Sequence, residues 1–134
     1  VPTLSVATFV VDDMPHALVA ARLSAEFGIG VRHGCFCAHP YLLKLLDLSD
    51  AEVHAYRAHV LAGDRRLIPG AVRASAGLAT SGDDIDRFVE ALRAITTTKS
   101  PVAYEQDPHT GDFHPDHPAW SDLNRAVGAS CARG

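Results

Sequence analysis

The sequence predicts an α/β (α+β) domain: a small, mainly antiparallel sheet of about three strands with helices packed on one face. Three stretches of strand length, residues 3–11, 29–34 and 70–78, alternate between two faces. Helical patterns separate and follow these stretches. A chain of 134 residues is long enough for one domain with a real core. The exposed face is expected to carry Arg32 and Arg73. A sheet covered on one face only usually needs a partner domain or subunit.

The first strand and helix follow from local pattern. Residues 3–11 are expected to form a mostly buried strand, and Asp13 to act as the N-cap of the helix that follows. Apolar residues recur every four positions on one face of that helix, at Val19, Leu23 and Phe27. Arg22 and Glu26 are expected to point outward. Gly28 stands where a left-handed C-cap residue belongs.

The middle of the chain predicts a short strand and a helical insert. In residues 29–34, Arg32 lies between two glycines, which leave room for another group to approach beside it. Residues 40–46 are expected to form a short apolar helix that begins at a proline. A second helix over residues 49–63 begins with a capping box, Ser49 to Glu52.

The third strand, residues 70–78, carries Arg73 among small and apolar side chains. The segment from Thr80 to Asp84 begins the clearest helix of the chain, and its two acidic residues suit the positive end of the helix dipole. The apolar stripe of this helix consists of Ile85, Phe88, Val89, Leu92 and Ile95.

Residue 98 is the predicted domain boundary. Residues 1–98 form the domain, and residues 99–134, with four prolines and a turn-rich cluster, form a C-terminal tail. The tail shows little periodicity, apart from a short helix expected near residues 121–127.

Composition excludes several classes of protein. The net charge is −4 and the twelve lysines and arginines are scattered, which argues against nucleic-acid binding. No apolar run approaches the ~18 residues that span a bilayer. Three cysteines without a secretory signal indicate free thiols in a reducing compartment, so a cytoplasmic protein is expected. Because residue 1 is Val, the chain is expected to be a fragment.

Residues 28–40 hold the densest group of chemically capable side chains. Its potential zinc ligands are His33, Cys35, Cys37 and His39. Four alternating ligands on one extended segment cannot easily close a tetrahedron, so no metal site is predicted. The histidines of the tail are expected to lie in a solvated loop; they are His109, His114 and His117. Cys131 is expected to be incidental.

Two motifs resemble a known family. Residues 31–40, Val-Arg-His-Gly-Cys-Phe-Cys-Ala-His-Pro, resemble a C-terminal segment of class V aminotransferases and cysteine desulfurases. Residues 71–78, Ala-Val-Arg-Ala-Ser-Ala-Gly-Leu, followed by the serine-capped helix start at 81–88, resemble a second signature of that family. Both occur in the family's order, and the resemblance covers residues 3–96.

The resemblance implies the small C-terminal domain of a fold-type-I enzyme that uses pyridoxal 5′-phosphate. In that family the large upstream domain holds the cofactor lysine and most cofactor contacts, and the complete protein is usually a homodimer. The only lysines here are Lys44 and Lys99, and neither lies in a segment like the family's lysine loop. The resemblance therefore implies part of an enzyme, whether a proteolytic remnant, a split subunit, an artificially shortened chain or a natural stand-alone domain, and assigns no cofactor-binding residue to this chain.

The resemblance also implies roles for individual residues. Arg73 would bind the α-carboxylate of an amino-acid substrate, Cys37 would accept sulfur as a persulfide, and Arg32 and His33 would shape the same pocket. The structural alternatives are a local salt bridge for Arg73, a buried thiol for Cys37, a surface charge for Arg32 and a polar loop residue for His33.

The reaction stays open between transamination, desulfuration, elimination and epimerisation. Two other functions remain as alternatives. One is a non-catalytic binding or assembly domain. The other is a small zinc or thiol-redox module.

Overall fold

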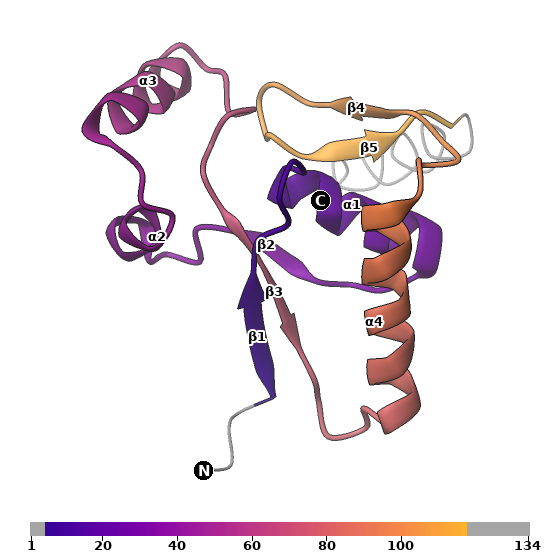
Figure 1. The fold of residues 1–134 in the computed structure, drawn as a ribbon. Helices are drawn as coiled ribbons and strands as arrows, with labels where there is room; N and C mark the ends of the chain where they lie inside the picture. Colours follow the sequence, from indigo (N-terminus) through magenta and orange to yellow (C-terminus); the bar gives the residue numbers. More distant parts are fainter. Residues whose placement is uncertain (1–4, 118–134) are drawn as a thin grey trace, which may run out of the picture.

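The structure, a computed structural model, describes residues 5–117. It is a mixed α/β fold with helices packed against a sheet, which confirms the predicted fold class (Figure 1). The strands are β1 (Val6–Phe9), β2 (Arg32–Gly34), β3 (Ala71–Ser75), β4 (Tyr104–Gln106) and β5 (Phe113–Pro115). The helices are α1 (His16–Phe27), α2 (His39–Leu45), α3 (Asp50–Leu61) and α4 (Gly82–Thr97).

The main sheet has the order β1-β3-β2, with both neighbours antiparallel to the central β3. α1 and α4 lie on one side of the molecule, whereas α2 and α3 form an arm on the other side (Figure 1). The register aligns Phe9, Val72 and His33 in one row across the sheet. Val72 is completely buried, so this row faces the core. Because strand residues alternate, the next row faces away from α1 and α4.

The core forms where α1 and α4 meet the sheet. Its fully buried members are Val19, Leu23, Val72, Ala91 and Ile95. The predicted apolar face of α1 is confirmed, and Phe27 packs against its edge. On α4, Phe88 and Leu92 also pack against the core.

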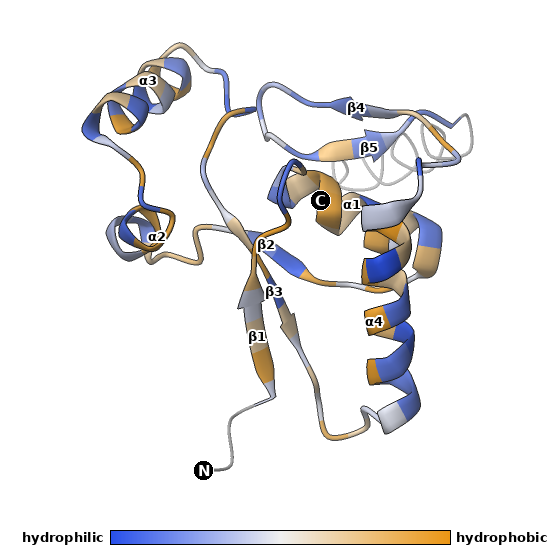
Figure 2. Cartoon of the chain, viewed as in Figure 1, coloured by the Kyte–Doolittle hydropathy of each residue, from blue (hydrophilic) through white to orange (hydrophobic). Residues whose placement is uncertain are grey.

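The predicted stripe of α4 is wrong in its first turns. Ile85 and Val89 are 45% and 38% exposed, respectively. The N-terminal half of α4 stands beside an open groove lined by the ends of β1 and β3 and by residues 28–31. Both side chains line this groove and are not part of the core. Figure 2 shows hydrophobic positions in both halves of α4.

Arg22 contradicts the prediction that it points outward, since it is only 5% exposed. Its Nε donates to Glu26 Oε1 at 2.7 Å. Its Nη1 donates to the Ile95 carbonyl at 2.7 Å, and its Nη2 donates to the Thr98 carbonyl at 3.3 Å. α4 docks on α1 through its last turn, so Arg22 satisfies carbonyls that a helix end leaves unpaired.

Glu26 is likewise turned inward, which also contradicts the sequence prediction. Besides Arg22, it accepts hydrogen bonds from Ser100 Oγ at 3.0 Å and from the Tyr104 hydroxyl at 3.2 Å. Burial alone would raise the pKa of Glu26, but these hydrogen bonds outweigh burial and hold the pKa below its ordinary value. Burial and the nearby Glu26 charge raise the pKa of Tyr104 to about 12.

The helix ends follow the predicted signals with one exception. The capping box of Ser49 and Glu52 is present, and Ser81 forms another with Asp84. Gly28 is a left-handed C-cap with φ of 68°. Asp13, however, is not the N-cap of α1. It has φ of 59° and belongs to a tight turn closed by a bridge between Val11 and Met14, so the helix begins two residues later without a side-chain cap.

β4 and β5 form a hairpin within the segment predicted to be a tail, which the sequence pattern did not predict. β5 packs against α1 (Figure 1). The Arg65 N–H donates to the Pro108 carbonyl at 2.7 Å, which ties the hairpin loop to the connection before β3. The boundary at residue 98 stays a prediction. The helix expected at 121–127 and Cys131 lie outside the described residues.

No helix within residues 5–117 combines the length and the apolar character that crossing a membrane requires.

Candidate functional site

Two arginines lie side by side on the face of the sheet that points away from α1 and α4. Arg32 of β2 and Arg73 of β3 are direct partners in the register, and Thr8 of β1 is the partner of Arg73 on its other side. Directly opposed residues on neighbouring strands project from the same face. Arg73 is half-buried and Arg32 is exposed. The structure therefore brings together the two arginines that the sequence analysis singled out.

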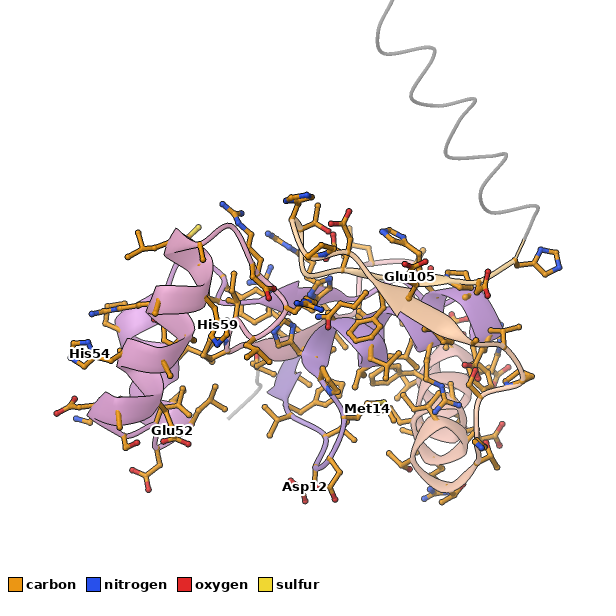
Figure 3. All side chains as sticks on the ribbon, turned by 90° about the horizontal axis from the view of Figure 1, so that it is seen from above. Asp12, Met14, Glu52, His54, His59 and Glu105 are labelled. Carbon is orange, nitrogen blue, oxygen red and sulfur yellow. The ribbon has the colours of Figure 1, made fainter. Side chains whose placement is uncertain are left out.

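Neither arginine has an acidic partner among residues 5–117. Like charges placed directly opposite each other destabilise a sheet. Glu52, an acidic residue of the arm formed by α2 and α3, is used in the capping box at the start of α3 (Figure 3). The arginine pair thus presents unneutralised guanidinium groups, which favour a carboxylate or phosphate bound through parallel N–H donors.

Cys37 lies in a tight turn directly after β2. The Ala38 N–H donates to the Cys35 carbonyl at 2.9 Å and closes the turn. Its two central residues, Phe36 and Cys37, have φ of 51° and 60°. Positive φ at both central positions is typical of a type I′ turn, which normally uses glycine or asparagine. Cys37 is an exposed free thiol, and Cys35 is free and half-buried.

Phe36 connects this turn to the arginine pair. The Arg73 guanidinium carbon lies over the Phe36 ring, 4.9 Å from its centroid. This distance is typical of a cation–π contact. The local sequence pattern assigns no role to Phe36, because it does not show which face of the sheet the turn folds back on.

His33 is not brought together with the arginines. It shares the row of Val72 and faces the core side, where its Nδ1 lies 3.2 Å from Nδ1 of His16. The other ring nitrogen of His33 lies 3.4 Å from Asp112 of the hairpin. His16 Nε2 donates to the Ile68 carbonyl at 3.0 Å, because a carbonyl only accepts. When His16 is neutral, its Nδ1 is therefore an acceptor for His33.

The cluster of His16, His33 and Asp112 joins segments far apart in the sequence. Burial, followed by the neighbouring His33 charge, lowers the pKa of His16, although the Ile68 carbonyl and Asp112 oppose that shift. The cluster lines a cavity together with Cys35 and Gly70. Sequence reasoning could not find it, because neither His16 nor Asp112 belongs to a recognisable motif.

The alternative zinc site is not assembled. Cys35 and His33 line the core-side cavity, Cys37 is exposed in the turn, and His39 Nε2 lies 2.6 Å from the Tyr56 hydroxyl in the arm. Within the described part of the chain, no group of three or more histidines, cysteines or acidic residues is arranged to hold a metal ion.

The described residues do not by themselves fit pyridoxal phosphate. Lys44 lies in the last turn of α2, and Lys99 follows α4, so neither lies in a strand of the arginine-bearing sheet. The face offers arginines for an anionic group and a thiol for nucleophilic chemistry. It offers no lysine placed beside them for a Schiff base.

Comparison with known proteins identified relatives over about two thirds of the chain. A probable cysteine desulfurase of Pseudomonas aeruginosa is 35% identical over 91 residues, which cover 68% of this chain and 17% of that protein. The probable cysteine desulfurase of Pseudomonas putida is 36% identical over the same length and with the same shares. The molybdenum cofactor sulfurase of Anopheles gambiae is 34% identical over 97 residues, 66% of this chain and 13% of that protein.

The chain thus spans less than a fifth of the length of these relatives. No protein-family model matches it, and no solved structure matches it significantly.

Proposed function

We infer that this chain is a C-terminal part of a protein related to cysteine desulfurases and molybdenum cofactor sulfurases. We propose that it forms the small domain of a pyridoxal-phosphate-dependent enzyme that acts on an amino acid. The observation that carries this proposal is the pair of directly opposed arginines, Arg32 and Arg73, with no acidic partner in the described residues. A substrate carboxylate would neutralise the pair.

Arg73 is the residue proposed to bind the α-carboxylate. It lies on the central strand, where β1 and β2 hold its backbone from both sides. Its guanidinium fork presents two parallel donors to a carboxylate, and each charge-assisted hydrogen bond contributes ~1.5–3 kcal/mol. Arg32, exposed on the edge strand, is proposed to add positive potential to the same pocket.

Cys37 is proposed to accept the sulfur of the substrate. Its thiolate would attack that sulfur, form an S–S bond and become a persulfide, while the bond from sulfur to the substrate carbon breaks and its electron pair stays with the carbon. Exposure of the thiol in the turn supports this role, because a buried thiol would be inert. His33, on the opposite face, is proposed to support the strand rather than to contact substrate.

The cofactor is proposed to be held by a large domain outside this chain. This accounts for relatives more than five times longer than the matched region and for the absence of a lysine from the strands described. Bound pyridoxal phosphate supplies the electron sink for reactions at the amino-acid carbons. The complete protein is proposed to be a homodimer whose subunits, with the large domain, cover the open face of the sheet.

The test uses the full-length protein. Arg73→Ala should weaken amino-acid binding at least tenfold and leave cofactor binding within twofold, because only the carboxylate loses its partners. Arg57→Ala, at an exposed position on α3, is the matched control and should change neither quantity. Binding is followed by titrating the cofactor absorbance with the amino acid. A full-length protein without bound pyridoxal phosphate would refute the proposal.

The role of Cys37 is tested separately. Cys37→Ala should abolish sulfide release from cysteine, whereas Cys35→Ala, two residues away in the same turn, should retain most of it. Sulfide release that survives Cys37→Ala would exclude the desulfurase form of the proposal and leave another reaction on the amino acid.

A further inference from the structure

We propose that Phe36 is a positioning residue that couples carboxylate binding at Arg73 to the placement of the Cys37 thiol. The proposal rests on the proposed function and extends it to a residue that touches neither the substrate sulfur nor its carboxylate. It follows from two observations, namely the cation–π contact between Arg73 and Phe36 and the left-handed turn that Phe36 shares with Cys37.

The contact with Phe36 leaves Arg73 able to bind its ligand. The guanidinium carbon of Arg73 lies over the Phe36 ring, 4.9 Å from the ring centroid. A carboxylate approaches in the plane of the guanidinium, along the N–H donors. The guanidinium has five N–H donors, so contact of its carbon with one ring leaves donors for a carboxylate. An aromatic face also reduces the freedom of a long side chain, which would otherwise lose that freedom when the ligand binds.

The turn connects the contact between Phe36 and Arg73 to the position of the Cys37 thiol. Phe36 and Cys37 are adjacent, and both have left-handed backbone conformations that disfavour side chains larger than glycine. One hydrogen bond, from the Ala38 N–H to the Cys35 carbonyl, closes this turn. A strained turn persists only where the surroundings hold it. Contact between Phe36 and Arg73 stabilises the turn in this way. Loss of the ring should therefore let the turn relax and move the Cys37 thiol.

The coupling is reciprocal by thermodynamic linkage. A carboxylate that orients Arg73 should stabilise the position of Phe36 and thereby the turn. Conversely, a relaxed turn should weaken the orientation of Arg73 only modestly, since β1 and β2 still hold its strand. Removal of the ring should therefore lower kcat more than it raises KM.

The experiment compares Phe36→Leu, Phe36→Tyr and the control Tyr41→Leu in the full-length protein. Tyr41 is an aromatic residue of the adjacent α2, is 64% exposed and forms no cation–π contact within residues 5–117. The first readout is the rate at which iodoacetamide alkylates Cys37, followed by mass spectrometry of the peptide that contains it. This readout does not require activity. The second readout is the separate measurement of kcat and KM for the amino acid.

Phe36→Leu should change the alkylation rate of Cys37 about fivefold and lower kcat about tenfold, with KM changed less than threefold. Phe36→Tyr, which keeps the ring, and Tyr41→Leu should resemble the unmodified protein. Propionate, a carboxylate without sulfur, should slow alkylation in the unmodified protein and have no effect in Phe36→Leu.

Unchanged alkylation and unchanged kcat in Phe36→Leu would overturn the coupling, even if Arg73→Ala shows that the carboxylate site exists. A changed alkylation rate that propionate does not affect would also overturn it, because the ring would then only support the turn. A third outcome separates the two proposals. If propionate slows alkylation only in the protein that has Phe36, but Arg73→Ala does not weaken amino-acid binding, the coupling is supported and the proposed substrate is refuted.

Discussion

Replacing Arg22 by Met tests whether the buried ion pair holds α4 and the C-terminal segment on α1. Methionine keeps the apolar length of the side chain and removes its charge and donors. The side chains of Arg22 and Glu26 are only 6% and 10% exposed. The substitution leaves the Glu26 carboxylate and the carbonyls of Ile95 and Thr98 without their partner.

The expected loss follows from these contacts. Removal of one member of a buried ion pair costs ~3–5 kcal/mol of the free energy of unfolding. Glu26 keeps the hydrogen bonds from Ser100 and Tyr104, so the lower end applies. About 3 kcal/mol corresponds to a melting temperature lower by roughly 10 °C in a chain of this length.

Urea denaturation followed by circular dichroism measures this loss. Arg93→Met is the matched control, an exposed arginine on α4, and should change stability by less than ~0.5 kcal/mol. In the double variant Arg22→Met with Glu26→Leu, about 1 kcal/mol or more should be recovered, because no buried charge is left unpaired. A loss below ~1 kcal/mol in Arg22→Met would refute the reasoning, as would a double variant whose loss equals the sum of the single losses.

Three further predictions concern other parts of the fold. Ser81→Ala should lower the free energy of unfolding by about 1 kcal/mol, because α4 loses its capping box; an unchanged urea midpoint would contradict this. Gly111→Ala should cost ~2–3 kcal/mol, since φ is +83° and the new Cβ would lie 2.7 Å from the Arg65 carbonyl oxygen. Gly63→Ala, with φ of +86° and open space, is its control and should cost only ~1 kcal/mol in the same titration. The lowered pKa of His16 means that the unfolded chain binds more protons there, so stability should decline as the pH falls below the ordinary histidine value of 6.5. Urea titrations at several pH values should show this slope, and His16→Gln should flatten it; an equal slope in that variant would exclude His16 as its source.

Local signals in the sequence were sufficient for most helices and for the fold class. The serine caps at Ser49 and Ser81 and the left-handed Gly28 depend on residues within one turn of each other, so their pattern is visible along the chain. The same holds for the alternation around Arg73, which placed this charged residue on a strand. The prediction of Asp13 as an N-cap was wrong because the same residue suits both a turn and a helix cap. In the structure it belongs to the turn closed by the bridge between Val11 and Met14.

The tertiary structure decided which side chains meet. By itself, the sequence determined that Arg32, His33 and Arg73 lie on strands. The alternation also predicts that Arg32 and Arg73 share the exposed face, but only the pairing of β2 with β3 placed them directly opposite each other, since register is not encoded within either strand. Arg22 and Glu26 have the pattern of a solvent-facing pair, and only the docking of α4 and the hairpin buried them. Contacts between distant segments depend on register and docking, which no short stretch of sequence encodes.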